Sequence, residues 1–137
     1  MTKIITNHIL TVLIVLILFT SCSKNDSNDT PQKQTVTYEI TGNFSKTLNA
    51  YTTFTTTTNE TEDQNFMITS LPWSKTIEYP NNTIVVGLGI GSVELVSIPG
   101  ESVTIKIKVN GVTTEERSTT VGADELLPII SISHSFL

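Results

Sequence analysis

The fold is decided by Val103-Thr104-Ile105-Lys106-Ile107-Lys108-Val109-Asn110-Gly111. Apolar and polar side chains alternate up to Val109, and this period of two predicts a strand with one face in the core and one in water. Asn-Gly is the pair that a two-residue type I′ turn favours, because both of its central residues take positive φ. We therefore expect a β-hairpin whose return strand runs from Val112 through Glu116.

The same period recurs along the chain, and no stretch after residue 34 has a helical period. About seven to nine short strands separated by turn residues predict an all-β chain. A sheet with one apolar face must bury it against another, so we expect a small antiparallel β-sandwich of the immunoglobulin-like kind. The positions that share one parity are Val36, Tyr38 and Ile40; Leu48, Ala50, Thr52 and Phe54; Phe66 and Ile68; Ile77 and Tyr79; Ile84, Val86, Leu88 and Ile90; and Ile130 and Ile132.

Several segments between or within these strands carry further expectations. The acidic cluster in Asn59–Asp63 is expected to lie in a loop, because the segment is polar. Leu71-Pro72-Trp73 is expected to break a strand, since proline cannot donate a ladder hydrogen bond. Val93 to Ile98 is expected to continue the sheet. The glycines of Gly87–Gly91 all fall on the face opposite to the apolar one, so this strand is expected to have a bare face.

The amino terminus has the organisation of a secretory signal. Lys3 precedes an apolar run, Ile9–Phe19, and small residues follow before Cys22. The run is shorter than the ~20 residues that a membrane-spanning helix needs. Leu18-Phe19-Thr20-Ser21-Cys22 is similar to the signal of bacterial lipoproteins, in which the cysteine receives a diacylglyceryl group and becomes the first residue. We expect lipidation of Cys22 and durable membrane attachment, because each buried acyl CH₂ contributes ~0.8 kcal/mol.

Three segments are expected on this basis. Residues 1–21 are a cleaved lipoprotein signal peptide, residues 22–34 are the lipidated cysteine with a flexible tether, and residues 35–137 are the β-sandwich domain. Ser23–Gln32 has no apolar side chain that could join a core, as is typical of a tether. Its Lys- and Asp-containing start also resembles the surface-export signals of some Gram-negative lipoproteins. We expect an outer-membrane location, with the periplasmic and the surface face both left open.

Composition argues against several classes of function. Thirteen acidic and eight basic residues give the 137-residue chain a formal charge of −5, so nucleic acid is not an expected partner. With one cysteine and two histidines, no metal site and no cofactor are expected. His134 is expected on an edge strand or a frayed end, and Glu115-Glu116 and Asp124-Glu125 are expected to be solvated charges. No nucleophile motif is present, and we expect a chain that is not an enzyme.

Trp73 is the candidate ligand-binding residue of the domain. It lies in Leu71-Pro72-Trp73-Ser74-Lys75. In one hypothesis its large ring covers an open end of the sandwich. In the other, the ring is a platform on which a glycan stacks.

Three segments together resemble the MmpS family of transport accessory proteins: Val36–Gly42, Leu71–Lys75 and Val103–Gly111, of which Leu-Pro-Trp-Ser is the more specific part. The resemblance implies a small β-sandwich held outside a membrane and an association with RND-type exporters of lipids or siderophores. Family members typically carry a cysteine where Ile105 stands and another near the carboxyl terminus. Here the resemblance implies apolar packing of Ile105 against the last strand in place of that disulfide. Family members also usually have a transmembrane helix instead of a lipid anchor.

The expected function is that of a non-enzymatic, lipid-anchored lipoprotein of the cell envelope. Its β-sandwich would be an accessory or interaction module, with a transporter or another envelope protein as partner and the membrane contacted through Cys22. The alternative is a surface-exposed lipoprotein that binds a ligand such as a glycan. A hydrolase is the third hypothesis, and no motif favours it.

Overall fold

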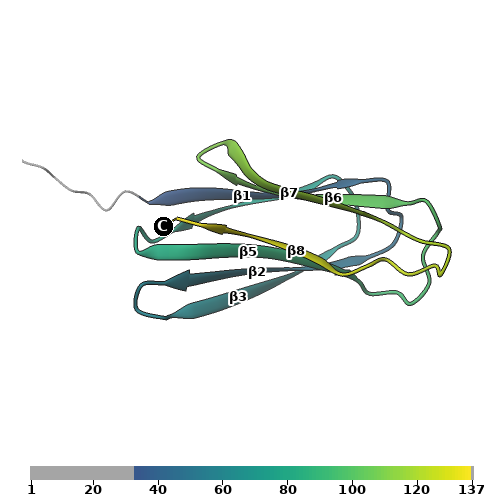
Figure 1. Cartoon of the computed structure of the whole chain (residues 1–137), viewed down its shortest axis with the longest axis horizontal. Helices are drawn as coiled ribbons and strands as arrows, with labels where there is room; N and C mark the ends of the chain where they lie inside the picture. Colours follow the sequence, from purple (N-terminus) through teal and green to yellow (C-terminus); the bar gives the residue numbers. More distant parts are fainter. Residues whose placement is uncertain (1–32, 137) are drawn as a thin grey trace, which may run out of the picture. The chain divides into compact units, whose positions relative to one another are not determined.

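The computed structural model describes residues 33–136. Within that range the chain has no helix and forms two antiparallel four-stranded sheets, in the orders β4-β1-β6-β7 and β3-β2-β5-β8. The sheets pack face to face (Figure 1). The predicted antiparallel β-sandwich is therefore confirmed. The strands are β1 (Gln34–Gly42), β2 (Leu48–Thr56), β3 (Thr61–Ile68), β4 (Trp73–Tyr79), β5 (Thr83–Ser92), β6 (Ser102–Val109), β7 (Val112–Thr120) and β8 (Ile130–Ser135).

The core lies where the alternation in the sequence predicts it. The predicted inward positions of β1, β2, β5 and β6 are buried except Phe54, Ile84 and Val109, which are only partly buried. The buried aliphatic side chains form one cluster between the sheets. Ile105 and Ile130 belong to this cluster, and Ile132 packs against it. The turn between β6 and β7 is also as predicted, since Asn110 and Gly111 have φ of 50° and 83°.

The loops gather at two ends of the sandwich, because every neighbouring pair of strands is antiparallel. We call the end at which β1 begins the entry end; it also carries the turns at residues 57–60, 80–82 and 110–111. We call the opposite end the loop end (Figure 1). The loop end carries residues 43–47, 69–72, 93–101 and 121–129.

The expected loop over Asn59–Asp63 is wrong in its second half. β3 begins at Thr61, and Glu62 and Asp63 pair with β2. The turn comes earlier, where the Asn59 N–H donates to the carbonyl oxygen of Thr56 at 2.9 Å. β3 is an edge strand, and an edge tolerates acidic side chains because they stay in water and discourage pairing with a further strand.

The expected continuation of the sheet through Val93–Ile98 is also wrong. β5 ends at Ser92, whose hydroxyl donates to the carbonyl oxygen of Glu94 at 2.9 Å and accepts from its N–H at 3.1 Å. This local turn competes with ladder hydrogen bonds and takes the chain out of the sheet. Residues 93–98 therefore form a loop, although their composition is that of a strand.

Candidate functional site

Trp73 closes one side of the sandwich rather than an end. It is the first residue of β4, so the strand break predicted over Leu71-Pro72-Trp73 ends at Pro72. Its partly buried ring packs against Phe66 of β3, in the other sheet, with the ring centres 5.3 Å apart. Phe54 and Tyr79 make a second such contact between the sheets, at 4.9 Å. Trp73 thus has a packing role, and the side of its ring that Phe66 covers is not open to a stacking ligand.

Side chains of β2 cover part of the outer face of β5, which its glycines alone would leave without side chains. A Cβ at Gly89 would collide with the ring of Tyr51, and one at Gly87 would lie 2.8 Å from Cγ2 of Thr53. The ring of Tyr51 therefore lies directly on the strand backbone, and the side chain keeps 38% of its surface exposed. Beside it is a cavity of about 240 Å³, also lined by Ser131 and Ser133. An aromatic ring flanked by hydroxyl groups can contact a small polar ligand.

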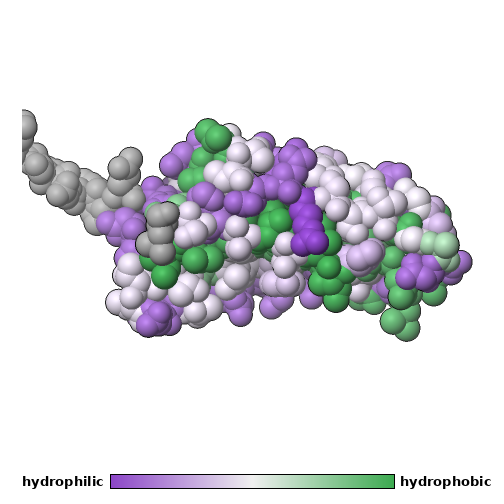
Figure 2. Space-filling model, in the orientation of Figure 1, coloured by the Kyte–Doolittle hydropathy of each residue, from purple (hydrophilic) through white to green (hydrophobic). Residues whose placement is uncertain are grey.

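A second, larger feature lies at the loop end. Six aliphatic residues there are each at least half exposed, and we call them the loop patch. Figure 2 shows hydrophobic residues gathered at this end of the sandwich. Leu95 is 86% exposed, which is the highest value among the exposed large hydrophobic residues of the described part. The loop patch consists of Val93, Leu95, Val96, Ile98, Leu126 and Ile129.

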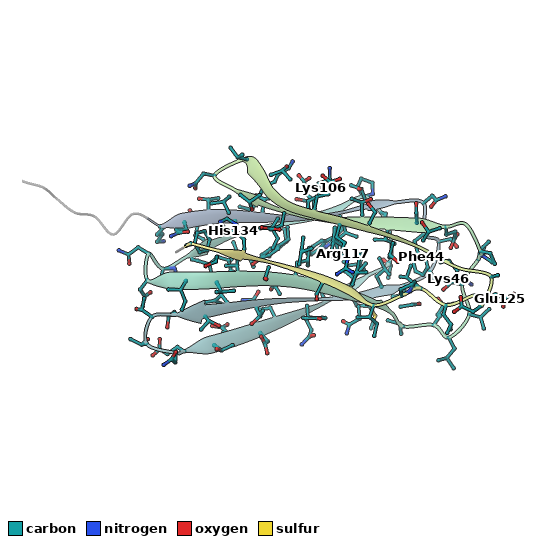
Figure 3. The ribbon with its side chains drawn as sticks, in the orientation of Figure 1. Phe44, Lys46, Lys106, Arg117, Glu125 and His134 are labelled. Carbon is teal, nitrogen blue, oxygen red and sulfur yellow. The ribbon has the colours of Figure 1, made fainter. Side chains whose placement is uncertain are left out.

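Charged groups and a cavity accompany the loop patch. The cavity measures about 420 Å³ and is lined by residues 94–98 together with Lys46. The ammonium group of Lys46 lies 3.3 Å from the Glu94 carboxylate. Ser97 lines the cavity. Within residues 33–136, its buried Oγ and Oε2 of the buried Glu101 have no hydrogen-bond partner. Lys46 and Glu125 both lie at this end in Figure 3.

Two tyrosines form a buried polar contact inside the core. The hydroxyl groups of Tyr38 and Tyr79 are 2.8 Å apart, and Thr52 also bonds the Tyr79 hydroxyl. Burial raises the pKa of both phenols, most strongly that of Tyr38, because the charged form would lose its hydration. Both phenols are therefore neutral at physiological pH. Their burial between the sheets gives them a structural role, since no substrate can reach them there.

His134 lies on β8, an edge strand, as predicted. Its Nδ1 is 3.8 Å from Oε1 of Glu115, and its ring meets Phe136 edge-on. Arg117, two residues after Glu115, donates to the carbonyl oxygen of Ser131 at 3.5 Å. Polar side chains of β7 thus reach across to β8 and close the second side of the sandwich (Figure 3).

The paired acids are solvated, as the sequence predicts. Glu116 bonds Lys106 at 3.1 Å on an exposed surface, while Glu115 turns toward His134. Asp124 and its neighbour are exposed in the loop between β7 and β8. Each of these side chains lies in water or beside a basic group, so the arrangement does not resemble a pair of catalytic acids.

Residues 33–136 contain neither a metal-ligand cluster nor a membrane-spanning helix. That range holds no group of three or more His, Cys, Asp or Glu side chains placed to bind a metal ion. The same range contains no helix that is long and apolar enough to cross a membrane. Cys22, the expected lipidation site, the signal peptide and most of the tether lie outside the described residues.

Sequence reasoning missed both surface features, for different reasons. The loop patch was hidden because residues 93–98 have the composition of a strand. The position of Tyr51 could have been found, since its parity is opposite to that of Leu48 and Ala50 and therefore places it on the outer face. No family model matches the chain and no curated protein is found to be similar to it, so its likeness to MmpS proteins stays a prediction drawn from three segments.

Proposed function

We propose that the protein is a non-enzymatic, lipid-anchored lipoprotein of the cell envelope whose β-sandwich is an accessory and interaction module. The observation that supports this proposal is the loop patch. Monomeric proteins rarely expose contiguous apolar surface of more than a few hundred Å², and larger patches are typical of contact sites. Leu95 and its neighbours lie in water in the isolated domain. A contact with another protein would bury them.

The position of the loop patch suits an anchored module. The chain enters the sandwich at Gln34, at the entry end, and the loop patch is at the opposite end. A lipid on Cys22 would hold the chain to the membrane through the segment that precedes Gln34. The loop end would then be the end that is free to meet another component of the envelope.

A transporter subunit is the partner that the sequence favours. The support is the resemblance of three segments to MmpS transport accessory proteins, with Leu71-Pro72-Trp73-Ser74 as its most specific part. In the structure this segment leads into β4 and supplies the Trp73 ring that closes the sandwich. The segment therefore supports the shared fold more directly than a shared partner.

The test is crosslinking of the lipidated protein in intact cells, followed by capture and identification of the proteins attached to it. Cys22→Ala is the control, and incorporation of labelled palmitate is measured in both forms. We expect label in the natural chain, none in Cys22→Ala, and a transporter subunit among the crosslinked proteins. Label retained in Cys22→Ala would rule out the anchor, and crosslinks only to abundant envelope proteins would argue against the accessory role.

A second candidate function is binding of a glycan on the outer face of β2, β5 and β8. The observation in its favour is the exposed ring of Tyr51 beside a cavity lined with serine hydroxyl groups. Isothermal titration with oligosaccharides would measure it. Binding that is lost in Tyr51→Ala and kept in Trp73→Phe would place the ligand at this cavity, whereas the reverse would place it at Trp73.

A further inference from the structure

The loop patch is one surface built from two loops. The Ser97 N–H donates to the carbonyl oxygen of Glu125 at 2.8 Å, which joins the loop between β5 and β6 to the loop between β7 and β8. Ile129 continues the surface toward the sheet, because its Cγ1 would lie 3.6 Å from a Cβ at Gly91. Aliphatic side chains from both loops therefore form one continuous surface.

The loop between β5 and β6 contributes little to the stability of the sandwich. It leaves Ser97 Oγ and Glu101 Oε2 buried without hydrogen-bond partners, and an unpaired buried oxygen costs free energy. It also holds four aliphatic side chains in water, where they gain nothing from the hydrophobic effect. Neither feature contributes to the stability of the sandwich. The exposed aliphatic side chains are the feature that contact with another molecule would bury.

The charge of the loop end indicates which class of partner could bind there. The four loops of the loop end carry four carboxylates and one ammonium group, and that ammonium group, on Lys46, is already paired with Glu94. Two copies of this surface would bring like charges together, so the charge opposes a symmetric dimer through it. An anionic lipid surface would be repelled for the same reason. A basic surface would be attracted.

We infer that the loop patch binds a protein segment that combines aliphatic side chains with lysine or arginine. This inference rests on the proposed role as an interaction module and names the class of its partner. The aliphatic side chains of that segment occupy the cavity of about 420 Å³ beside residues 94–98. Its cationic side chains lie near Asp124 and Glu125, which are exposed beside the patch. The apolar contact provides affinity, and the charges select the partner.

The experiment uses the full lipidated chain in living cells, with a photo-crosslinking amino acid in place of Leu95. Val112 is the matched control position, since it is 67% exposed but lies at the entry end. Crosslinked peptides are identified by mass spectrometry. We expect Leu95 to capture one protein reproducibly, through a segment with lysine or arginine next to aliphatic residues. Position 112 should not capture that protein.

A charge reversal tests the second half of the inference. Glu125→Lys should reduce the yield of the Leu95 adduct by roughly fivefold or more, because like charges across an interface repel. Glu60→Lys is the matched control, since Glu60 is also exposed but lies in a turn at the entry end, and it should leave the yield unchanged. An equal loss of adduct in both variants would overturn the assignment of charge to this surface.

The remaining outcomes separate this inference from the proposed function. Adducts of Leu95 with lipid, with a second copy of the chain or with an acidic segment would each overturn the inference. Capture of a protein at position 112 and not at Leu95 would overturn it while leaving the interaction module in place. No protein adduct at either position, in a chain that carries labelled palmitate, would overturn both.

Discussion

The buried tyrosine pair should make the fold sensitive to alkali. Tyr38 and Tyr79 are neutral in the folded core, and burial raises the pKa of both. In the unfolded chain each phenol ionises near pH 10. Above that pH the unfolded state binds fewer protons than the folded state, so the free energy of unfolding falls as pH rises. Below pH 10 both states hold their phenol protons, so the tyrosine pair causes no loss in the free energy of unfolding.

The size of this effect follows from linkage. A buried phenol that stays neutral lowers the free energy of unfolding by about 1.4 kcal/mol per pH unit above pH 10, so Tyr38 should cost about 1.4 kcal/mol at pH 11, and Tyr79 acts in the same direction. In Tyr38→Phe only Tyr79 contributes, and the loss between pH 8 and pH 11 should be smaller by about 1.4 kcal/mol. At pH 8 the variant should itself be less stable by about 1 kcal/mol, since a hydrogen bond is removed.

Urea unfolding of the chain from Ser23 onward, followed by circular dichroism at pH 8 and pH 11, measures both quantities. Tyr51→Phe is the matched control, because that ring lies on the outer face in contact with water. It should lose as much stability as the natural chain between the two pH values. If Tyr38→Phe also loses the full amount, the phenol is not held neutral by the fold and the reasoning fails.

Three further substitutions test packing, backbone and surface. Ile105→Ala removes a side chain with no exposed surface and should lower the free energy of unfolding by about 2–5 kcal/mol; a loss in urea unfolding below about 1 kcal/mol would contradict its core position. Gly42 has φ of 140°, and a Cβ there would collide with the carbonyl oxygen of Ser102, so Gly42→Ala should lower Tm clearly, and an unchanged Tm would refute the strain. Leu95→Ser should change stability by less than about 0.5 kcal/mol, because the side chain is exposed; unfolding of that variant would show that Leu95 belongs to the core.

The fold could be predicted from the sequence to the level of a sandwich, and the site could not. Alternation is a local property, so Val36, Ile105 and Leu88 reveal their buried faces without knowledge of their neighbours. The pairing of strands is not local. β1 lies between β4 and β6, and the hydroxyl groups of Tyr38 and Tyr79 meet across 41 residues of chain.

The loop patch and the cavity beside Tyr51 could not be predicted for the same reason, because both depend on which segments become neighbours. A segment of strand-like composition forms a strand only if a neighbouring strand offers unpaired backbone N–H and C=O groups. At Val93–Ile98 the turn made by Ser92 leads the chain away from the sheet. Parity places Tyr51 on the outer face, but it does not say that the ring lies over Gly89 of the neighbouring strand.

The sequence by itself determined the all-β class, the inward faces of the strands and the Asn110-Gly111 turn, because each depends on residues a few positions apart. It is also the sole basis for the expected lipidation of Cys22. Only the tertiary structure decided which strands are neighbours, how Trp73 closes the side of the sandwich against Phe66, and which aliphatic residues stay in water at the loop end. These depend on contacts between distant segments, and their positions are set when the two sheets pack together.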